Sequence, residues 1–153
     1  MNDAVAKDPL IPLLYFVQGV LRTIHEIPSN SASEALIKKA FSPDASIEIN
    51  QDAMDRTGLE EFLQDYRARY TFVDFAFHEG VTVPSDEEGH GGTVGVGFKA
   101  HAVGKADGKL YGARLHEIFQ VEWVSGHESS GGHRLITKLT GVLKGMYLVQ
   151  DDT

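Results

Sequence analysis

The sequence predicts an α+β domain in which three N-terminal helices cover one face of a curved, mainly antiparallel sheet. Apolar residues recur every three or four positions up to about residue 70, which is the spacing of a buried helix face. From residue 73 they recur at every second position, which is the spacing of a strand. The 153 residues contain no repeat or linker and suit a single domain, 1–153, with an ordered core of about 8–148.

Each of the three expected helices begins at a recognisable signal. Pro9 and Pro12 suit the first turn of a helix that ends before Pro28. Segments 31–34 and 57–60 each match a capping box, in which Ser or Thr is followed three residues later by Glu, and they start the second and third helices. The apolar positions of the three helices are Leu10, Leu13, Leu14, Val17, Leu21 and Ile24; Leu36, Ile37 and Phe41; and Leu59, Phe62, Leu63, Tyr66 and Tyr70.

One short strand and a four-stranded meander are expected. Pro43 and Asp44 turn the chain into a short strand over 45–50. The four later strands are predicted over 73–83, 94–102, 115–123 and 135–143. Their turns are Asp107-Gly108, typical of a two-residue hairpin, and the glycine-rich stretches 89–92 and 126–132.

The Asp107-Gly108 turn predicts a register for the two central strands. In a two-residue loop Ala106 pairs with Lys109, and counting back places Phe98 opposite Glu117. One face of this strand pair is then apolar except for the carboxylate of Glu117. The other face mixes polar and apolar side chains, and with the last strand it includes Lys99, His101, Arg114, His116, Ile118, Gln120, Ile136 and Val142.

Composition excludes several classes of protein. The chain contains no cysteine, which excludes disulfides, thiol nucleophiles and Cys-ligated metals. A net charge of −8 without a basic cluster argues against nucleic acid and anionic membranes as partners. The seven histidines show no metal-binding spacing, and no glycine-rich stretch precedes a helix, so we expect no metal and no cofactor. The apolar run 10–21 is too short for a membrane span and lacks the flanks of a signal peptide, which predicts a cytoplasmic protein.

The segments 41–49 (FSPDASIEI), 56–62 (RTGLEEF) and 115–122 (LHEIFQVE), with the element order, resemble the nuclear transport factor 2-like superfamily, and within it the SnoaL-like, polyketide cyclase-like branch. The likeness covers nearly the whole chain. It implies a cone-shaped fold with a pocket at the open end of the sheet. Members include cyclases, ketosteroid isomerases, dehydratases, epoxide hydrolases and proteins without catalysis, so function has to be argued from residues.

Glu117 is the leading catalytic candidate. In an apolar pocket, desolvation favours the neutral acid, which can donate a hydrogen bond to a carbonyl or transfer a proton. The resemblance implies the same role, because ketosteroid isomerases carry a buried carboxyl on the equivalent strand. The alternative is a solvated Glu117 at the rim of the cone. Ile49 occupies the place of those isomerases' proton-shuttling carboxylate, so steroid isomerisation itself is not expected.

The other candidates have plain structural alternatives. His25 could reach the pocket from the first helix, or simply bond a carbonyl in the last helical turn. Tyr66 could offer its hydroxyl to a ligand or pack in the core. Glu79 has inward parity, unless a bulge at Gly80 turns it outward. The remaining expected pocket residues are Phe62, Phe77, Phe98, Phe119 and Thr137.

These observations support two functional hypotheses. The first is an enzyme for cofactor-independent isomerisation, cyclisation or dehydration of an apolar, polyketide- or terpenoid-like molecule, with Glu117 and His25 as its catalytic residues. The second is a ligand carrier or dimeric interaction module of the same fold. The half-polar outer face of the sheet predicts a homodimer in either case. A cavity of about 300–1,000 Å³ would favour a ligand site, and a filled cone would favour the second hypothesis.

Overall fold

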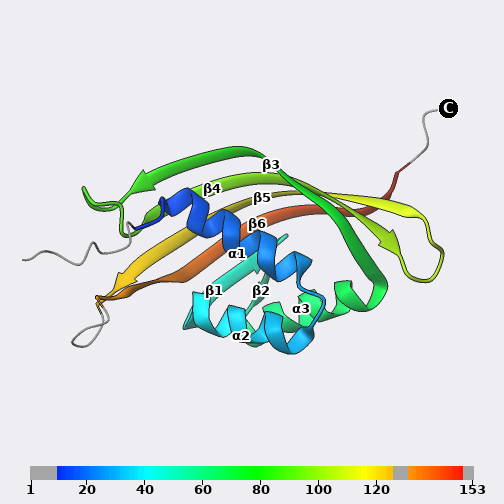
Figure 1. The fold of residues 1–153 in the computed structure, drawn as a ribbon, viewed down its shortest axis with the longest axis horizontal. Coiled ribbons are helices and arrows are strands. Elements are labelled where there is room, and N and C mark those ends of the chain that lie inside the picture. The colour runs from blue at the N-terminus through cyan, green and yellow to red at the C-terminus, as the bar shows by residue number, and fades with distance from the viewer. Residues whose placement is uncertain (1–9, 126–130, 150–153) are drawn as a thin grey trace, which may run out of the picture.

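In the computed structural model the helices lie against one face of a curved sheet (Figure 1). The described part of the chain forms three helices and a six-stranded sheet. The structure describes residues 10–125 and 131–149. The strand order is β2-β1-β6-β5-β4-β3, with β1 parallel to β6 and every other pair antiparallel. The α+β class and the helices-on-sheet arrangement predicted from sequence are confirmed.

The helices are α1 (Leu13–Glu26), α2 (Asn30–Ala40) and α3 (Arg56–Arg69). Within the described residues no helix combines the length and the apolar character needed to cross a membrane. Pro12 is the N-cap of α1 rather than a first-turn residue, and Pro9 lies outside the described residues. Helix α1 presents a buried stripe to the sheet: Leu13, Val17, Val20, Leu21 and Ile24.

Both predicted capping boxes are wrong by two residues. The N-cap of α2 is Ser29, whose hydroxyl accepts from the Ala32 N–H, and Ser31 instead shares a hydrogen bond with Ser29. The N-cap of α3 is Asp55, whose Oδ1 accepts from the Gly58 N–H at 2.8 Å. Ser and Asp are as good at this position as the predicted Ser and Thr, so sequence spacing alone did not distinguish them.

The strands are β1 (Phe41–Ile49), β2 (Asp52–Met54), β3 (Tyr70–Pro84), β4 (Gly92–Gly104), β5 (Leu110–Val124) and β6 (His133–Leu148). The predicted turn at Pro43 is wrong, because β1 already starts at Phe41 and includes Pro43. Pro43 lies where the pairing of β1 with β6 is interrupted, between Phe41 and Ser46. Proline is tolerated in a strand where the ladder is interrupted. The short strand β2 was not predicted; it follows a turn at Asn50 and Gln51, both with positive φ.

The predicted register of β4 and β5 is shifted by two residues. The loop is longer than two residues: Gly104 N–H donates to Lys109 O, and Gly108 adopts a positive φ of 69°. Phe98 therefore faces Leu115, and Glu117 faces Val96. A shift of two preserves the alternation of faces, so Glu117 still points to the inner face with Leu115.

The core lies between the helices and the inner face of the sheet, and its largest fully buried side chains are Phe41, Phe98 and Phe119. The prediction that Ile136 lies on the outer face is wrong, because Ile136 is fully buried. The ladder between β5 and β6 shifts where Gln120 pairs with Lys138 and Val121 with Ile136. Thr137 is the extra residue, and this bulge reverses the alternation of the first part of β6.

Candidate functional site

A small apolar cavity lies between helices α1 and α3 and the inner face of the sheet. It is lined by His25, Phe62, Leu63, Tyr66, Phe72, Ala100, Ala113, Leu115, Leu143 and Met146. Ala100 and Ala113 face each other across β4 and β5, and their short side chains leave the space unfilled. The volume is about 20 Å³, enough for about one water molecule. We call this space the interior cavity.

His25 lines the interior cavity from the last turn of α1. Its Nδ1 lies 2.7 Å from the Leu21 carbonyl oxygen, which can only accept, so Nδ1 carries the proton and Nε2 keeps its lone pair. The ring centroids of Phe72, Phe75 and Phe98 lie 5.6, 5.1 and 5.9 Å from that of His25. Burial lowers the pKa of His25 to about 4, although the hydrogen bond to the Leu21 carbonyl raises it in part. The imidazole is therefore neutral at pH 7.

Glu117 is buried on the inner face of β5, between Val96 of β4 and Gly141 of β6. A Cβ at position 141 would lie 3.0 Å from Cγ and 3.3 Å from Oε2 of Glu117, so the side chain lies over the glycine. Burial raises the pKa of Glu117 to about 8, and within the described chain no hydrogen bond or charge offsets that effect. Glu117 is therefore a neutral carboxylic acid at pH 7.

The structure places Glu117 one row behind the interior cavity. Leu115 and Leu143, which pair across β5 and β6, form one end of the cavity lining. The next pair along these strands whose positions face the helices is Glu117 with Gly141. Phe98 contacts the His25 ring and lies diagonally from Glu117, at about 7–8 Å between Cα atoms in a regular sheet. Glu117 and His25 thus belong to one apolar interior, but the Leu115 row separates the acid from the cavity.

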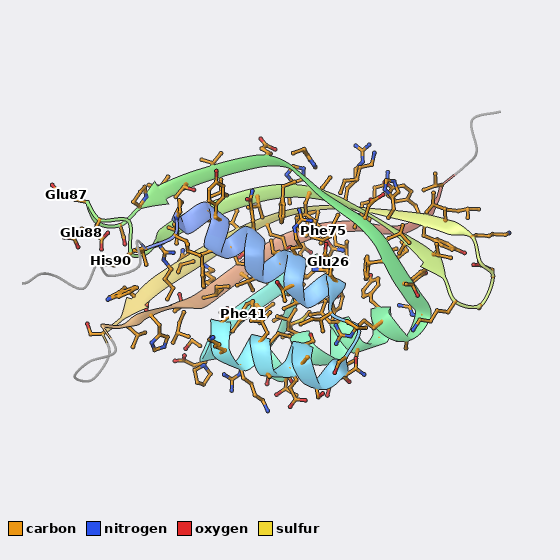
Figure 2. All side chains as sticks on the ribbon, in the orientation of Figure 1. Glu26, Phe41, Phe75, Glu87, Glu88 and His90 are labelled. Carbon is orange, nitrogen blue, oxygen red and sulfur yellow. The ribbon has the colours of Figure 1, made fainter. Side chains whose placement is uncertain are left out.

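The predicted aromatic residues divide into two groups. Phe62 and Tyr66 line the interior cavity, with ring centroids 4.9 Å apart. Phe98 and Phe119 are fully buried in the core, and Phe77 packs against the core on Phe75. Figure 2 labels Phe75 in the layer between β3 and α1.

Two predicted pocket residues lie away from the interior cavity. Glu79 is exposed, and its Oε2 lies 3.8 Å from Nδ1 of His116 on the outer face. The β3–β4 ladder shifts between Phe77 and Glu79, so the bulge falls at His78 rather than at Gly80. The Thr137 hydroxyl donates to the Gln120 carbonyl oxygen, 3.4 Å away, at the bulge of β6.

Arg67 was not singled out from sequence. It is 9% exposed on α3 and lines a cleft of about 120 Å³ that shares His25 and Phe72 with the interior cavity. The signal was available, since Arg67 lies four residues after Leu63 and eight after Leu59, on the buried stripe of the helix.

The tip of the β3–β4 hairpin brings together three groups that could ligate a cation. Potential ligand atoms of Asp86, Glu88 and His90 all lie within 4.8 Å of one another. Figure 2 shows Glu88 and His90 on this projecting tip. His90 Nδ1 lies 3.1 Å from Asp86 and 3.2 Å from Glu88, so the three groups also satisfy one another. The sequence predicts no metal site, and these three groups, at i, i+2 and i+4 on the hairpin tip, leave that prediction untested.

Comparison with known proteins places the fold. No model of a known protein family matches the chain, and no curated protein matches it in sequence. A solved NTF2-like protein of unknown function in nutrient uptake from Rhodospirillum rubrum superposes with a TM-score of 0.56 at 10% identity, covering 90% of this chain and 98% of that one. A ketosteroid isomerase-like protein from Erwinia carotovora atroseptica gives 0.54 at 14% identity, covering 89% and 99%.

A SnoaL-like family member from Agrobacterium tumefaciens gives a TM-score of 0.51 at 11% identity, with 86% of this chain and 97% of that chain covered. The protein therefore has the nuclear transport factor 2-like fold, with SnoaL-like and ketosteroid isomerase-like proteins among its structural neighbours. The resemblance stated from sequence is confirmed at the level of the fold. At these identities the likeness carries no information on substrate or reaction.

Proposed function

We propose that the protein binds a small apolar molecule in the interior cavity and isomerises, cyclises or dehydrates it by acid–base chemistry without a cofactor. The observation that carries this proposal is the pair of neutral titratable groups, His25 and Glu117, in one apolar interior. Groups whose pKa values are shifted this far by burial cost folding free energy and are concentrated at functional sites.

The two groups supply complementary chemistry. The protonated carboxyl of Glu117 donates a hydrogen bond to a carbonyl oxygen and stabilises the negative charge that develops there in an enolate-like transition state. His25 accepts a hydrogen bond from a ligand hydroxyl at Nε2, and Tyr66 offers a hydroxyl from the opposite helix. Glu117, with a pKa of about 8, is matched to proton donation near neutral pH.

Access to Glu117 requires movement. The interior cavity holds about 20 Å³, and Leu115 and Leu143 stand between it and the acid. A ligand must therefore displace these two side chains and Met146, whose unbranched thioether adapts easily to a new shape.

The small volume favours a second candidate function. A cavity of about 20 Å³ is well below the roughly 300–1,000 Å³ typical of ligand sites, as expected for a non-catalytic carrier or interaction module. In this case Glu117 is a buried structural acid, and the outer face of the sheet is the functional surface.

The outer face supports a homodimer under either function. A groove of about 330 Å³ crosses it, with Val81, Ile118 and Val142 on its walls. Ile118 and Val142 are 54% and 66% exposed. In a self-complementary interface, the same face of a second copy would cover these two apolar side chains.

A ligand screen separates the two functions. Wild type, Glu117→Gln and Glu60→Gln are heated with cyclic ketones, dienones, polyketide aromatics and terpenoids. A ligand at a hundred times its dissociation constant adds about 2.7 kcal/mol of stability. Glu60 is a matched control, because it is also a buried acid with a pKa raised by burial, but it lies on α3 among the charged groups of Glu34, Lys38 and Arg56 rather than on the inner face of the sheet.

Stabilisation of wild type and Glu60→Gln that weakens in Glu117→Gln supports the enzyme. Equal stabilisation of all three proteins supports a carrier and removes Glu117 from the site. A response from none of them contradicts ligand binding and leaves the interaction module.

A further inference from the structure

Arg67 is a buried cation without an anionic partner in the part of the chain that the structure describes. Its Nε donates to Asn30 Oδ1 at 2.8 Å, and Nη1 donates to the Ile24 carbonyl oxygen at 3.2 Å. Burial lowers the pKa of the guanidinium, and no carboxylate within the described residues counters this effect. An arginine carries five N–H donors, so three of them remain for another acceptor.

Arg134 is a second buried arginine, and its guanidinium has acceptors on all three nitrogens. It is 6% exposed, and Nε, Nη1 and Nη2 donate to the carbonyl oxygens of His90, Ile11 and Gly89 at 2.6–2.8 Å. All three nitrogens are thus satisfied. Arg67 has a comparable overall burial, but its Nη2 has no acceptor among the described residues. Nη2 is not one of the fully buried unpaired side-chain atoms, so it is reached from the cleft that Arg67 lines and can donate to a partner there.

The cleft that Arg67 lines is positively charged. Lys105 also lines it, held by a backbone hydrogen bond from its N–H to the Arg69 carbonyl oxygen. The one carboxylate on this cleft is that of Glu26, which lies 3.3 Å from the Arg22 guanidinium. Figure 2 shows Glu26 at the end of α1 that borders the cleft.

The cleft and the interior cavity share a wall. His25 and Phe72 line both, so the two spaces meet at these rings. The cleft holds about 120 Å³ and has polar lining groups, whereas the cavity beyond the rings is apolar. The polarity of these two adjoining spaces matches a molecule with a charged end and an apolar end. Because the cavity holds only about 20 Å³, the apolar end enters by displacing Leu143 and Met146.

We propose that Arg67 and Lys105 bind the carboxylate of an amphiphilic acid whose apolar part enters the interior cavity past His25 and Phe72. A guanidinium binds a carboxylate with two parallel hydrogen bonds, and one arginine with one lysine matches a single negative charge. This inference rests on the proposed function and assigns its ligand to a chemical class.

The test compares hexanoate, hexan-1-ol and acetate by NMR titration of the ¹⁵N-labelled full chain. Wild type, Arg67→Gln and Lys105→Gln are titrated, with Arg69→Gln as the matched control. Arg69 is an exposed arginine on the same helix that pairs with Asp65, and it does not line the cleft. Lys105 is exposed, so Lys105→Gln keeps the test valid if Arg67→Gln does not fold.

Hexanoate is expected to bind wild type about tenfold more tightly than hexan-1-ol, the ratio that a charge-assisted hydrogen bond provides. The preference should disappear in Arg67→Gln, fall in Lys105→Gln and persist in Arg69→Gln. Equal binding of hexanoate and hexan-1-ol would overturn the carboxylate site while leaving the interior ligand site. Acetate binding as tightly as hexanoate would support the anion site and contradict the apolar one. No binding of either acid overturns the inference.

Discussion

The protein interior around Glu117 and the protein interior around His25 differ in the space they leave and in the groups that border them. Around Glu117 the interior is closed toward the interior cavity, because the side chain lies over Gly141 and behind the Leu115 row, and we call this part the sealed half. Residues Glu117 and Gly141 also border the groove on the outer face of the sheet. Around His25 there is an interior cavity, and the ring forms the wall to a charged cleft. The sealed half resembles a structural core, whereas the open half offers the access that a ligand requires.

Burial acts on the two groups in opposite directions. It raises the pKa of Glu117 to about 8 and lowers that of His25 to about 4, because it disfavours the charged form of either group. Both are neutral at pH 7, but their contributions to stability change with pH in opposite senses.

The largest expected effect is a loss of stability as the pH rises past Glu117. The native state keeps a proton between pH 4.5 and about 8 that the unfolded chain has released, so the free energy of unfolding falls as pH rises through this window. At about 1.4 kcal/mol per pH unit, the whole window corresponds to on the order of 5 kcal/mol. Urea unfolding of wild type and Glu117→Gln at pH 5, 6.5 and 8 measures it.

The difference between the two proteins isolates this group. Glu117→Gln is expected to gain stability relative to wild type as pH rises, and Glu60→Gln should show a much smaller change. A constant difference between wild type and Glu117→Gln would show that Glu117 is not a neutral acid in the native state.

The second effect has the opposite sign and belongs to His25. The native pKa of His25, about 4, lies below the ordinary 6.5. The contribution of His25 to the free energy of unfolding is therefore complete above pH 6.5 and is lost as the pH falls toward 4. The whole window corresponds to about 3 kcal/mol. In a Glu117→Gln background, where the opposing titration is absent, unfolding at pH 7 and pH 4.5 is compared with and without His25→Phe. Identical pH dependence of the two proteins would contradict a buried neutral His25.

The third effect measures how tightly the sealed half is packed. Gly141→Ala places a methyl group 3.0 Å from Glu117 Cγ, which is expected to cost about 1–3 kcal/mol of stability through overpacking. Shortening the acid should relieve the contact, so a double-mutant cycle with Glu117→Ala is expected to show coupling of about 0.5–3 kcal/mol. Gly95→Ala is the control, because nothing lies within 4 Å of a Cβ there. Additive effects of Gly141→Ala and Glu117→Ala would mean that the side chain has room to move.

The smallest expected effect on folding lies on the outer face and concerns assembly. Ile118→Asp puts a charge on a 54% exposed position beside the groove, so the stability of the monomer should change by no more than about 0.5 kcal/mol. Light scattering after size exclusion is expected to show a dimer for wild type and a monomer for Ile118→Asp. A monomeric wild type would contradict the proposed dimer.

The sequence predicted the inward position of Glu117 although it predicted the wrong pair. The assumed two-residue turn placed Phe98 opposite, whereas Val96 is the partner. Because strand side chains alternate with a period of two, an error of two leaves the face unchanged. The bulge at Thr137 instead shifts the register by one residue, which reverses the two faces. Ile136 therefore lies in the core and not on the predicted outer face.

Periodicity and composition thus determined by themselves the α+β class, the order of the main elements and the inward acid, because each depends on a local repeat along the chain. Tertiary structure alone decided that Arg67 has no anionic partner within residues 10–125 and 131–149, that His25 lies between a cavity and a cleft, and that Leu115 and Leu143 screen Glu117. Each of these facts depends on which side chains from distant segments fill the same space. Packing determines which distant side chains meet, and the spacing of residues along the chain does not carry this information.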